Sequence, residues 1–199
     1  ASQLVGGRVE EMEGAIGIIK TGLERTEAIV NDLKNFVRKD QPHFRPTDLH
    51  QGLDSTLTLL GHELGDMIKI EREYGQLDPV DTIPGQINQV FMNLLHNAIE
   101  AIRMKGSGEG LIRIRTWKKG QEACVSIWDS GTGVSKENQT RVFEPFFTTK
   151  EVGKGTGLGL AVTYRIIENH QGRIEFQSEA GKWTEFIIAL PTRQNEKAA

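Results

Sequence analysis

The sequence has no excess of basic residues, only one cysteine and no long apolar run. Its 199 residues include 24 Lys and Arg against 27 Asp and Glu, a formal net charge of −3, which disfavours nucleic-acid binding because that function needs a basic surface. The single cysteine, Cys124, excludes an intramolecular disulfide and argues against a cysteine-based metal cluster. No apolar run approaches the ~18 residues of a membrane span, and no signal peptide opens the chain. We therefore expect a soluble, cytoplasmic chain that contacts neither nucleic acid nor membrane.

The first part of the chain carries a heptad pattern. From Val9 to Val37 the key positions alternate steps of three and four residues, and only Thr26 among them is polar. This pattern predicts a long N-terminal helix whose apolar seam packs against another helix. We expect that partner helix to come from another chain or from sequence that precedes this one; docking of the seam on the main domain is the alternative. Pro42 and Pro46 predict a linker after it, so residues 1–45 form a predicted stalk.

Residues 46–192 are predicted to form the main domain, and residues 193–199 a polar tail. Apolar stripes at helical spacing predict helices over residues 48–64, 84–104 and 158–170, and residues 135–142 are expected to form a short helix. Alternating patterns predict strands over residues 68–74, 111–117, 122–128, 173–178 and 184–190, with loops at 77–85 and 144–156. This order of elements predicts an α/β two-layer sandwich, with helices on one face of a mixed, mostly antiparallel sheet.

Two asparagines lie one turn apart on the predicted helix 84–104. Asn93 and Asn97 share a face, and Glu100 follows one turn later. An amide oxygen is a hard ligand that Mg²⁺ accepts beside waters and phosphates. Asparagines on a helix are also commonly solvated or capping residues, so this pattern alone leaves both interpretations open.

Asp129 follows a predicted strand and precedes Gly131 and Gly133. An aspartate at such a position can simply satisfy its own turn. Alternatively, its carboxylate can accept a hydrogen bond from the exocyclic amine of adenine. Guanine presents a carbonyl oxygen at that place, so this second interpretation predicts selection of ATP over GTP.

The loop over residues 144–156 has no regular period, and we expect it to act as a lid. Lys150 and Lys154 are its candidate counter-charges for phosphate groups. Gly155, Gly157 and Gly159 then lead into a helix, so their amides are expected to converge at its positively polarised N-terminus. Neither the lysine-bearing phosphate loop of nucleotide triphosphatases nor the dinucleotide fingerprint is present.

Four segments, QVFMNLLHNAIEA, DSGTGV, FEPFFTTK and GKGTGLGLA, closely resemble in order and spacing the nucleotide-binding boxes of sensor histidine kinases of two-component systems. The resemblance spans about residues 45–191 and implies the Bergerat ATP-binding fold, shared with gyrase, Hsp90 and MutL ATPases. It implies a protein-histidine kinase that uses ATP and Mg²⁺ and transfers the γ-phosphate to a histidine, for relay to a response regulator aspartate. The alternatives are an ATP-gated clamp or chaperone-type ATPase of the same fold, and a non-catalytic nucleotide-binding dimerisation module.

The resemblance also implies roles for individual residues. By position, Asn97 matches the family's Mg²⁺ ligand, Asn93 its companion and Asp129 the adenine reader, while Asn93 and Lys150 are the catalytic candidates. GKWTEF, with Gly181 and Thr184, resembles a looser third glycine box. The implied nucleotide-binding set is Asn93, Asn97, Asp129, Gly131, Gly133, Val134, Phe143, Thr149, Lys150, Gly155, Thr156, Gly157, Leu158, Gly159, Leu160 and Thr184.

The predicted stalk resembles the second helix of the family's dimerisation hairpin, which implies a homodimer in the full-length protein. The implied partners are a phosphoacceptor helix, on a missing segment or another chain, and the receiver domain of a response regulator. The acceptor pattern His-Glu-x-x-x-Pro is absent; His62-Glu63 imitates its start but lacks the proline and lies beyond the linker. We therefore expect a fragment cut just after the acceptor helix, from a parent protein that is cytoplasmic or membrane-anchored. Many relatives carry a basic residue at Glu100, so we expect Lys150 to supply that charge instead.

Overall fold

The computed structural model describes residues 43–106, 108–150 and 155–194. The predicted stalk helix, the end of the polar tail and Lys154 lie outside these described residues. What the sequence predicts for these segments therefore stays a prediction.

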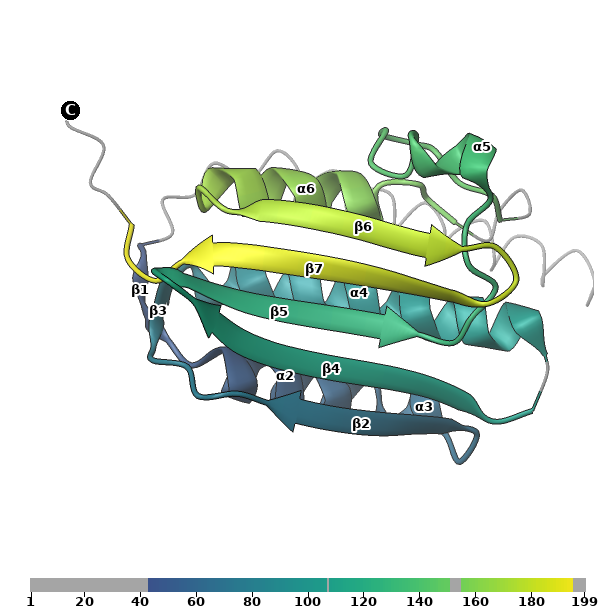
Figure 1. Cartoon of the computed structure of the whole chain (residues 1–199), viewed down its shortest axis with the longest axis horizontal. Coiled ribbons are helices and arrows are strands. Elements are labelled where there is room, and N and C mark those ends of the chain that lie inside the picture. The colour runs from purple at the N-terminus through teal and green to yellow at the C-terminus, as the bar shows by residue number, and fades with distance from the viewer. Residues whose placement is uncertain (1–42, 107, 151–154, 195–199) are drawn as a thin grey trace, which may run out of the picture.

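A five-stranded sheet forms one layer of the domain, in the order β2-β4-β5-β7-β6 (Figure 1). Its strands are β2 (Ile68–Tyr74), β4 (Gly110–Lys119), β5 (Glu122–Asp129), β6 (Arg173–Glu179) and β7 (Trp183–Pro191). β2 pairs with β4 in parallel, and the other three pairs are antiparallel. The predicted mixed, mostly antiparallel sheet is confirmed.

Three longer helices cover one face of this sheet, as predicted: α2 (Leu49–Leu59), α4 (Pro84–Lys105) and α6 (Gly159–Asn169) (Figure 1). The side chain of Asp48 caps α2 by accepting from the amides of His50 and Gln51, and Pro84 occupies the first turn of α4. Two four-residue helices, α3 (Gly61–Leu64) and α5 (Lys136–Gln139), complete the described helices. The helix predicted over residues 48–64 is therefore split, since Leu60 ends α2 and the chain turns before α3.

The core lies between the sheet and these helices because strand side chains alternate between its two faces. In β4, Ile112, Ile114 and Thr116 point inward and are at most 3% exposed. They meet the apolar stripe of α4, of which Phe91, Leu95 and Ile99 are each at most 1% exposed. Burying one such side chain contributes roughly 1.5–3 kcal/mol, so this contact holds α4 firmly against the sheet.

Two predicted irregular segments contain short strands instead. β1 (Arg45–Thr47) lies in the predicted linker, and β3 (Val80–Thr82) lies in the predicted loop 77–85. They pair with each other in an antiparallel two-stranded sheet. Three residues are too few to show a strand period, and a pairing across 35 residues of chain leaves no local pattern.

His170 joins three parts of the chain behind the sheet. Its side chain is fully buried; Nδ1 donates to the carbonyl of Ile166 at 2.7 Å, and Nε2 accepts from the amide of Ile83 at 3.1 Å. Phe44 packs edge-on against the ring, with centroids 5.1 Å apart. The ring thus ties the end of α6 to the start of α4 and to the chain that enters β1. Burial lowers the pKa of His170, which keeps the imidazole neutral and able to accept.

We expect His170→Leu to reduce the free energy of unfolding by about 1–3 kcal/mol at pH 8, because the partly buried amide of Ile83 loses its acceptor. Because the pKa of His170 is lowered in the folded state, its contribution to the free energy of unfolding is fully present above the pKa of an unfolded histidine, about 6.5. That contribution is lost as the pH falls below this pKa toward the lower folded-state value. The gap between the variant and the wild type should therefore narrow between pH 8 and pH 5. Urea unfolding at both pH values measures it, with His62→Leu on exposed α3 as control. An equal gap at both pH values would contradict this role.

Candidate functional site

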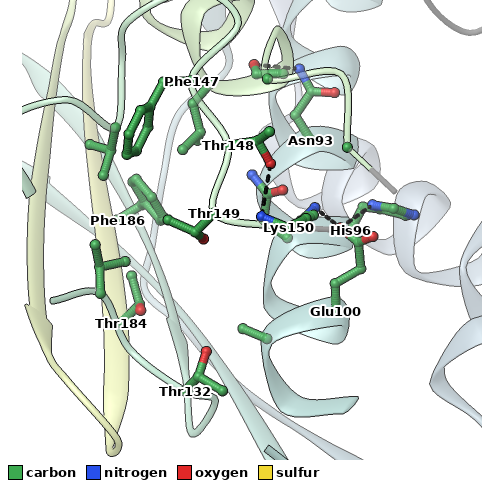
Figure 2. Close-up of a pocket in the computed structure, with 18 of the residues that line it drawn as sticks. Asn93, His96, Glu100, Thr132, Phe147, Thr148, Thr149, Lys150, Thr184 and Phe186 are labelled. Atoms are coloured by element: carbon green, nitrogen blue, oxygen red, sulfur yellow. Dashed lines mark hydrogen bonds and ion pairs between the residues drawn. The ribbon is translucent and has the colours of Figure 1, made fainter. Parts of the chain in front are cut away.

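A cavity of about 540 Å³ lies between α4, the inner face of β5, β6 and β7, and the segment that runs from α5 to α6 (Figure 2). Most of the predicted nucleotide-binding residues line it. They are Asn93, Asn97, Asp129, Gly133, Val134, Thr149, Lys150, Gly155, Thr156, Gly157, Gly159, Leu160 and Thr184. Residues distant in the sequence thus converge on one hollow.

Three residues of the predicted set are not among those that line the cavity. Gly131 lies under α4, where a Cβ would come within 2.6 Å of the Ala101 side chain. Leu158 is 3% exposed, and Phe143 packs against the rings of Tyr164 and Phe186. The side chains of Leu158 and Phe143 are thus used in packing, and Gly131 allows the backbone to pass close to α4, so the three residues support the cavity wall from behind.

The cavity also has lining residues that the predicted set does not contain. Ala101 and Met104 continue the α4 stripe of Asn93 and Asn97 at helical spacing, so periodicity could have identified them. Phe176 and Phe186 come from neighbouring strands, and their ring centroids lie 5.1 Å apart. No local pattern joins those two positions. The remaining additions are Met92, His96, Glu100, Thr132, Val142, Phe147 and Thr148.

Asp129 lies at one end of the cavity, at the end of β5. Its side chain is 4% exposed, and Oδ1 accepts from the amide of Gly131 at 2.8 Å. Within the described part of the chain, Oδ2 accepts no hydrogen bond. Burial raises the pKa of Asp129 to about 7, although the Gly131 amide and the charge of Lys105 both act to lower it. A nearly buried carboxylate therefore keeps one acceptor oxygen available in the cavity.

We expect Asp129→Asn to raise the free energy of unfolding of the ligand-free chain at pH 8. An aspartate with a raised pKa stabilises the fold fully only below its unfolded value, and this stability is lost as pH rises through about 7. Each unit of pKa shift corresponds to about 1.4 kcal/mol. Removing the buried charge should therefore raise the free energy of unfolding by roughly 1–3 kcal/mol at pH 8, and by less than half of that amount at pH 5. Urea unfolding at both pH values checks this, with exposed Asp66→Asn as control. A loss of stability at pH 8 would contradict it.

Helix α4 spans the cavity from this end to the other. The carbonyl of Ala101 accepts from the amide of Thr132 at 3.2 Å, which fixes α4 beside the turn after Asp129. Eight residues earlier, Asn93 Nδ2 donates to the carbonyl of Gly159 at 2.9 Å and to Thr163 Oγ1 at 3.3 Å. At a rise of 1.5 Å per residue the two anchor points lie about 12 Å apart. Asn97 lies between them, and its side-chain amide makes no hydrogen bond to other described residues.

The far end of the cavity is formed by the glycine-rich entry to α6. Gly157 has a φ of +67°, and a Cβ there would meet the backbone of Phe146 at 2.4 Å. The carbonyl of Gly157 accepts from the amide of Phe146 at 2.9 Å, so the two segments are held together. No side chain caps α6, whose first turn therefore presents amides and the positive end of the helix dipole. This end of the cavity suits an anion.

Lys150 lies at the side of the cavity and is not a free counter-charge. Its ammonium pairs with Glu100 Oε2, and His96 of α4 contacts the same carboxylate (Figure 2). The sequence predicted the charge of Lys150 but not its partner. At the opposite wall, Gly181 donates to the carbonyl of Thr132 at 2.6 Å, which places the predicted third glycine box directly against the first.

The fold and this cavity define a class of protein. The profile of the family described as histidine kinase-, DNA gyrase B- and HSP90-like ATPases matches residues 82–194, and the chain belongs to this family. Within it, the chain is similar to the catalytic domain of histidine kinase ThkA in a nucleotide-free form, with a TM-score of 0.66 and 32% identity over 76% of this chain and 99% of that one. The domain is thus a histidine kinase ATP-binding catalytic domain, as predicted.

The chain is also similar to longer proteins that are named as kinases or histidine kinases. Sporulation kinase E of Bacillus subtilis (strain 168) is 35% identical over 97% of this chain. A ThkA structure in complex with response regulator protein TrrA has a TM-score of 0.70 and 30% identity over 89% of this chain and 50% of that one. The chain spans only 26% of the length of sporulation kinase E and 41% of sporulation kinase C. Among the described residues, no helix has the length and hydrophobicity of a membrane span.

Proposed function

We propose that this chain binds Mg·ATP in the cavity and presents the γ-phosphate to a histidine on a phosphoacceptor helix. The observation that carries the proposal is the buried Asp129 carboxylate at one end of a 540 Å³ cavity whose other end is an uncapped helix N-terminus. The first end suits a base with an amine, and the second suits phosphates. The two anchor points of α4, about 12 Å apart, leave room for an extended nucleotide between them.

Asp129 reads the base in this proposal. Its free Oδ2 would accept from the adenine amine, while Oδ1 stays on the amide of Gly131. A carboxylate whose pKa is about 7 is ionised in an increasing fraction as pH rises, and the charge-assisted bond needs that ionised form. Guanine would place an acceptor against an acceptor, which a buried site penalises strongly.

The residues near α6 fit a magnesium ion carried by the phosphates. With Nδ2 of Asn93 engaged by Gly159 and Thr163, its Oδ1 remains as an acceptor, and Asn97 offers a second amide oxygen one turn away. No cluster of three or more His, Cys, Asp or Glu side chains suited to a metal occurs among the described residues. Mg²⁺ commonly uses few protein oxygens and completes its shell with waters and phosphates, so Asn97 and Asn93 would hold it. When bound, the ion neutralises phosphate charge.

Transfer is favoured over hydrolysis by the chemistry of Asn93. The amide of Asn93 cannot accept a proton from water. The gyrase-like hydrolases that this chain resembles have a glutamate at the corresponding position, and that glutamate activates water. A neutral histidine imidazole is already a nucleophile, so a kinase needs positioning and charge neutralisation rather than a base. The imidazole nitrogen forms a bond to the γ-phosphorus, the bond to the bridging oxygen breaks, and ADP leaves.

The partners follow from the relatives and are part of the proposal. The acceptor histidine lies on another chain or on sequence not present here, and the phosphoryl group passes to a response regulator receiver domain. The ThkA structure with TrrA supports such a partner. We further propose that residues 1–45 are a stalk that dimerises in the full-length protein, residues 46–192 the ATP-binding domain, and residues 193–199 a tail.

Incubation with γ-labelled ATP tests the proposal. We expect acid-labile label on a separately made acceptor-helix fragment, for example that of sporulation kinase E, and none on this chain alone. The fragment with its histidine changed to alanine is the control. Steady hydrolysis with no labelled protein would instead indicate a clamp-type ATPase. Label on this chain itself would contradict the prediction that it lacks a phosphoacceptor histidine.

The two ends of the cavity are separable by mutation. We expect Asp129→Asn to abolish measurable ATP binding, since an amide presents an N–H as well as an oxygen to the adenine amine. Asn97→Asp should retain ATP binding but shift its dependence on Mg²⁺ concentration, because the carboxylate adds a charge at the metal. Calorimetric titration with ATP at several Mg²⁺ concentrations measures both. Normal ATP affinity in Asp129→Asn would refute the adenine assignment.

A further inference from the structure

An ion pair spans the side of the cavity between its two ends. Lys150 Nζ contacts Glu100 Oε2 across 50 residues of sequence, and the two side chains are only 25% and 24% exposed. Figure 2 shows Lys150 reaching toward Glu100 and His96 of α4, and all three residues line the cavity. Glu100 is one turn from Asn97, so the carboxylate stands beside the proposed path of the phosphates.

The Glu100 carboxylate is held by a second basic group. His96 Nδ1 lies 3.2 Å from the same Oε2 atom, and His96 Nε2 lies 3.4 Å from Glu63 Oε2 on α3. Burial alone would raise the pKa of Glu100, but the hydrogen bonds from His96 and Lys150 outweigh it and lower the pKa. The hydrogen bond to Glu100 in turn raises the pKa of His96. Glu100 is therefore an ionised, oriented carboxylate inside a cavity that is proposed to bind a polyanion.

A carboxylate in this place opposes ground-state binding of phosphates. It repels them directly, and it occupies the ammonium that they would otherwise attract. The ordinary interpretation is that the pair merely stabilises the loop. An ion pair that only stabilises the fold does not need to lie inside the cavity. The Glu71–Arg113 pair, for example, bridges β2 and β4 on the opposite face of the sheet with an Nη2–Oε2 distance of 3.0 Å. Neither of its residues lines the cavity.

We propose that Glu100 is a positioning residue for Lys150. It holds the ammonium beside the phosphate path before nucleotide arrives, and it competes with the nucleotide for that ammonium afterwards. This inference rests on the proposed function. Its consequence is that Glu100 weakens binding of ATP but keeps Lys150 aligned for the transfer step, where charge moves toward the leaving oxygen.

A mutant cycle tests this assignment: wild type, Glu100→Gln, Lys150→Met and the double variant. Glutamine keeps the size of glutamate without its charge. We expect Glu100→Gln to lower the Kd of Mg·ATP by about fivefold, a typical effect of one partly exposed charge pair, and to leave the Kd of adenosine unchanged. In the Lys150→Met background the same substitution should improve the ATP affinity by less than about twofold, because competition for the ammonium has gone and only direct repulsion of the phosphates by a His96-paired carboxylate remains.

Transfer kinetics separate positioning from stability. With the acceptor-helix fragment, Glu100→Gln should lower the KM for ATP and also lower kcat by about tenfold, whereas a purely structural loss would raise KM. Glu100→Asp retains the carboxylate and should recover part of kcat. Glu71→Gln is the matched control, which removes a carboxylate from an ion pair outside the cavity and should change neither constant.

Two results would overturn the inference: weaker ATP binding in Glu100→Gln, or an equal effect of this substitution with and without Lys150. Should Glu100→Gln fail to fold, Glu100→Ala takes its place in the cycle, since wild-type kcat and KM in a variant without the carboxylate would also contradict a positioning role. A wild-type chain that binds no Mg·ATP would refute the proposed function itself. Normal wild-type ATP binding with no coupling between Glu100 and Lys150 would refute only the role of Glu100.

Discussion

The packing of α4 against the sheet is the interaction on which the rest of this domain depends. One stripe of the helix is buried, and its members are Ile87, Val90, Phe91, Leu94, Leu95, Ala98, Ile99 and Ile102. The adjacent stripe places Asn93, Asn97 and Glu100 along the cavity. Because a helix is rigid on the scale of a few turns, burial of the first stripe sets the positions of all three polar groups. Stability and site geometry therefore reside in the same element.

The two carboxylates of the cavity have opposite environments. Asp129 is buried with one backbone amide as its partner, and its pKa is raised to about 7. Glu100 is less buried and has two basic partners, and its pKa is lowered. Desolvation outweighs the opposing effects at Asp129, whereas at Glu100 the hydrogen bonds and charges of the two basic groups together outweigh desolvation. The Asp129 carboxylate is thus suited to accept a hydrogen bond from a neutral amine, whereas the Glu100 carboxylate is suited to be the counter-ion of a basic group.

The fold alone does not distinguish a kinase from the clamp-type ATPases that share it. The distinction lies in single side chains around the proposed γ-phosphate. Asn93 donates to Gly159 and Thr163 and has no basic character, so this side chain cannot act as a base that activates water. In the proposed function the site only neutralises and aligns the phosphate, and the attacking histidine comes from another segment.

The sequence by itself determined the elements whose patterns are local. The stripe of α4, the alternation in β4 and β5 and the glycines before α6 were all recognisable, because each depends on neighbours within a few residues. The motifs also identified most of the cavity lining. Sequence patterns did not show β1 and β3, the break after Leu59 or the contribution of Phe176 and Phe186. Only the tertiary structure decided these features, and it also decided that Lys150 meets Glu100. Pairings between distant segments depend on how the whole chain packs, and no periodicity records them.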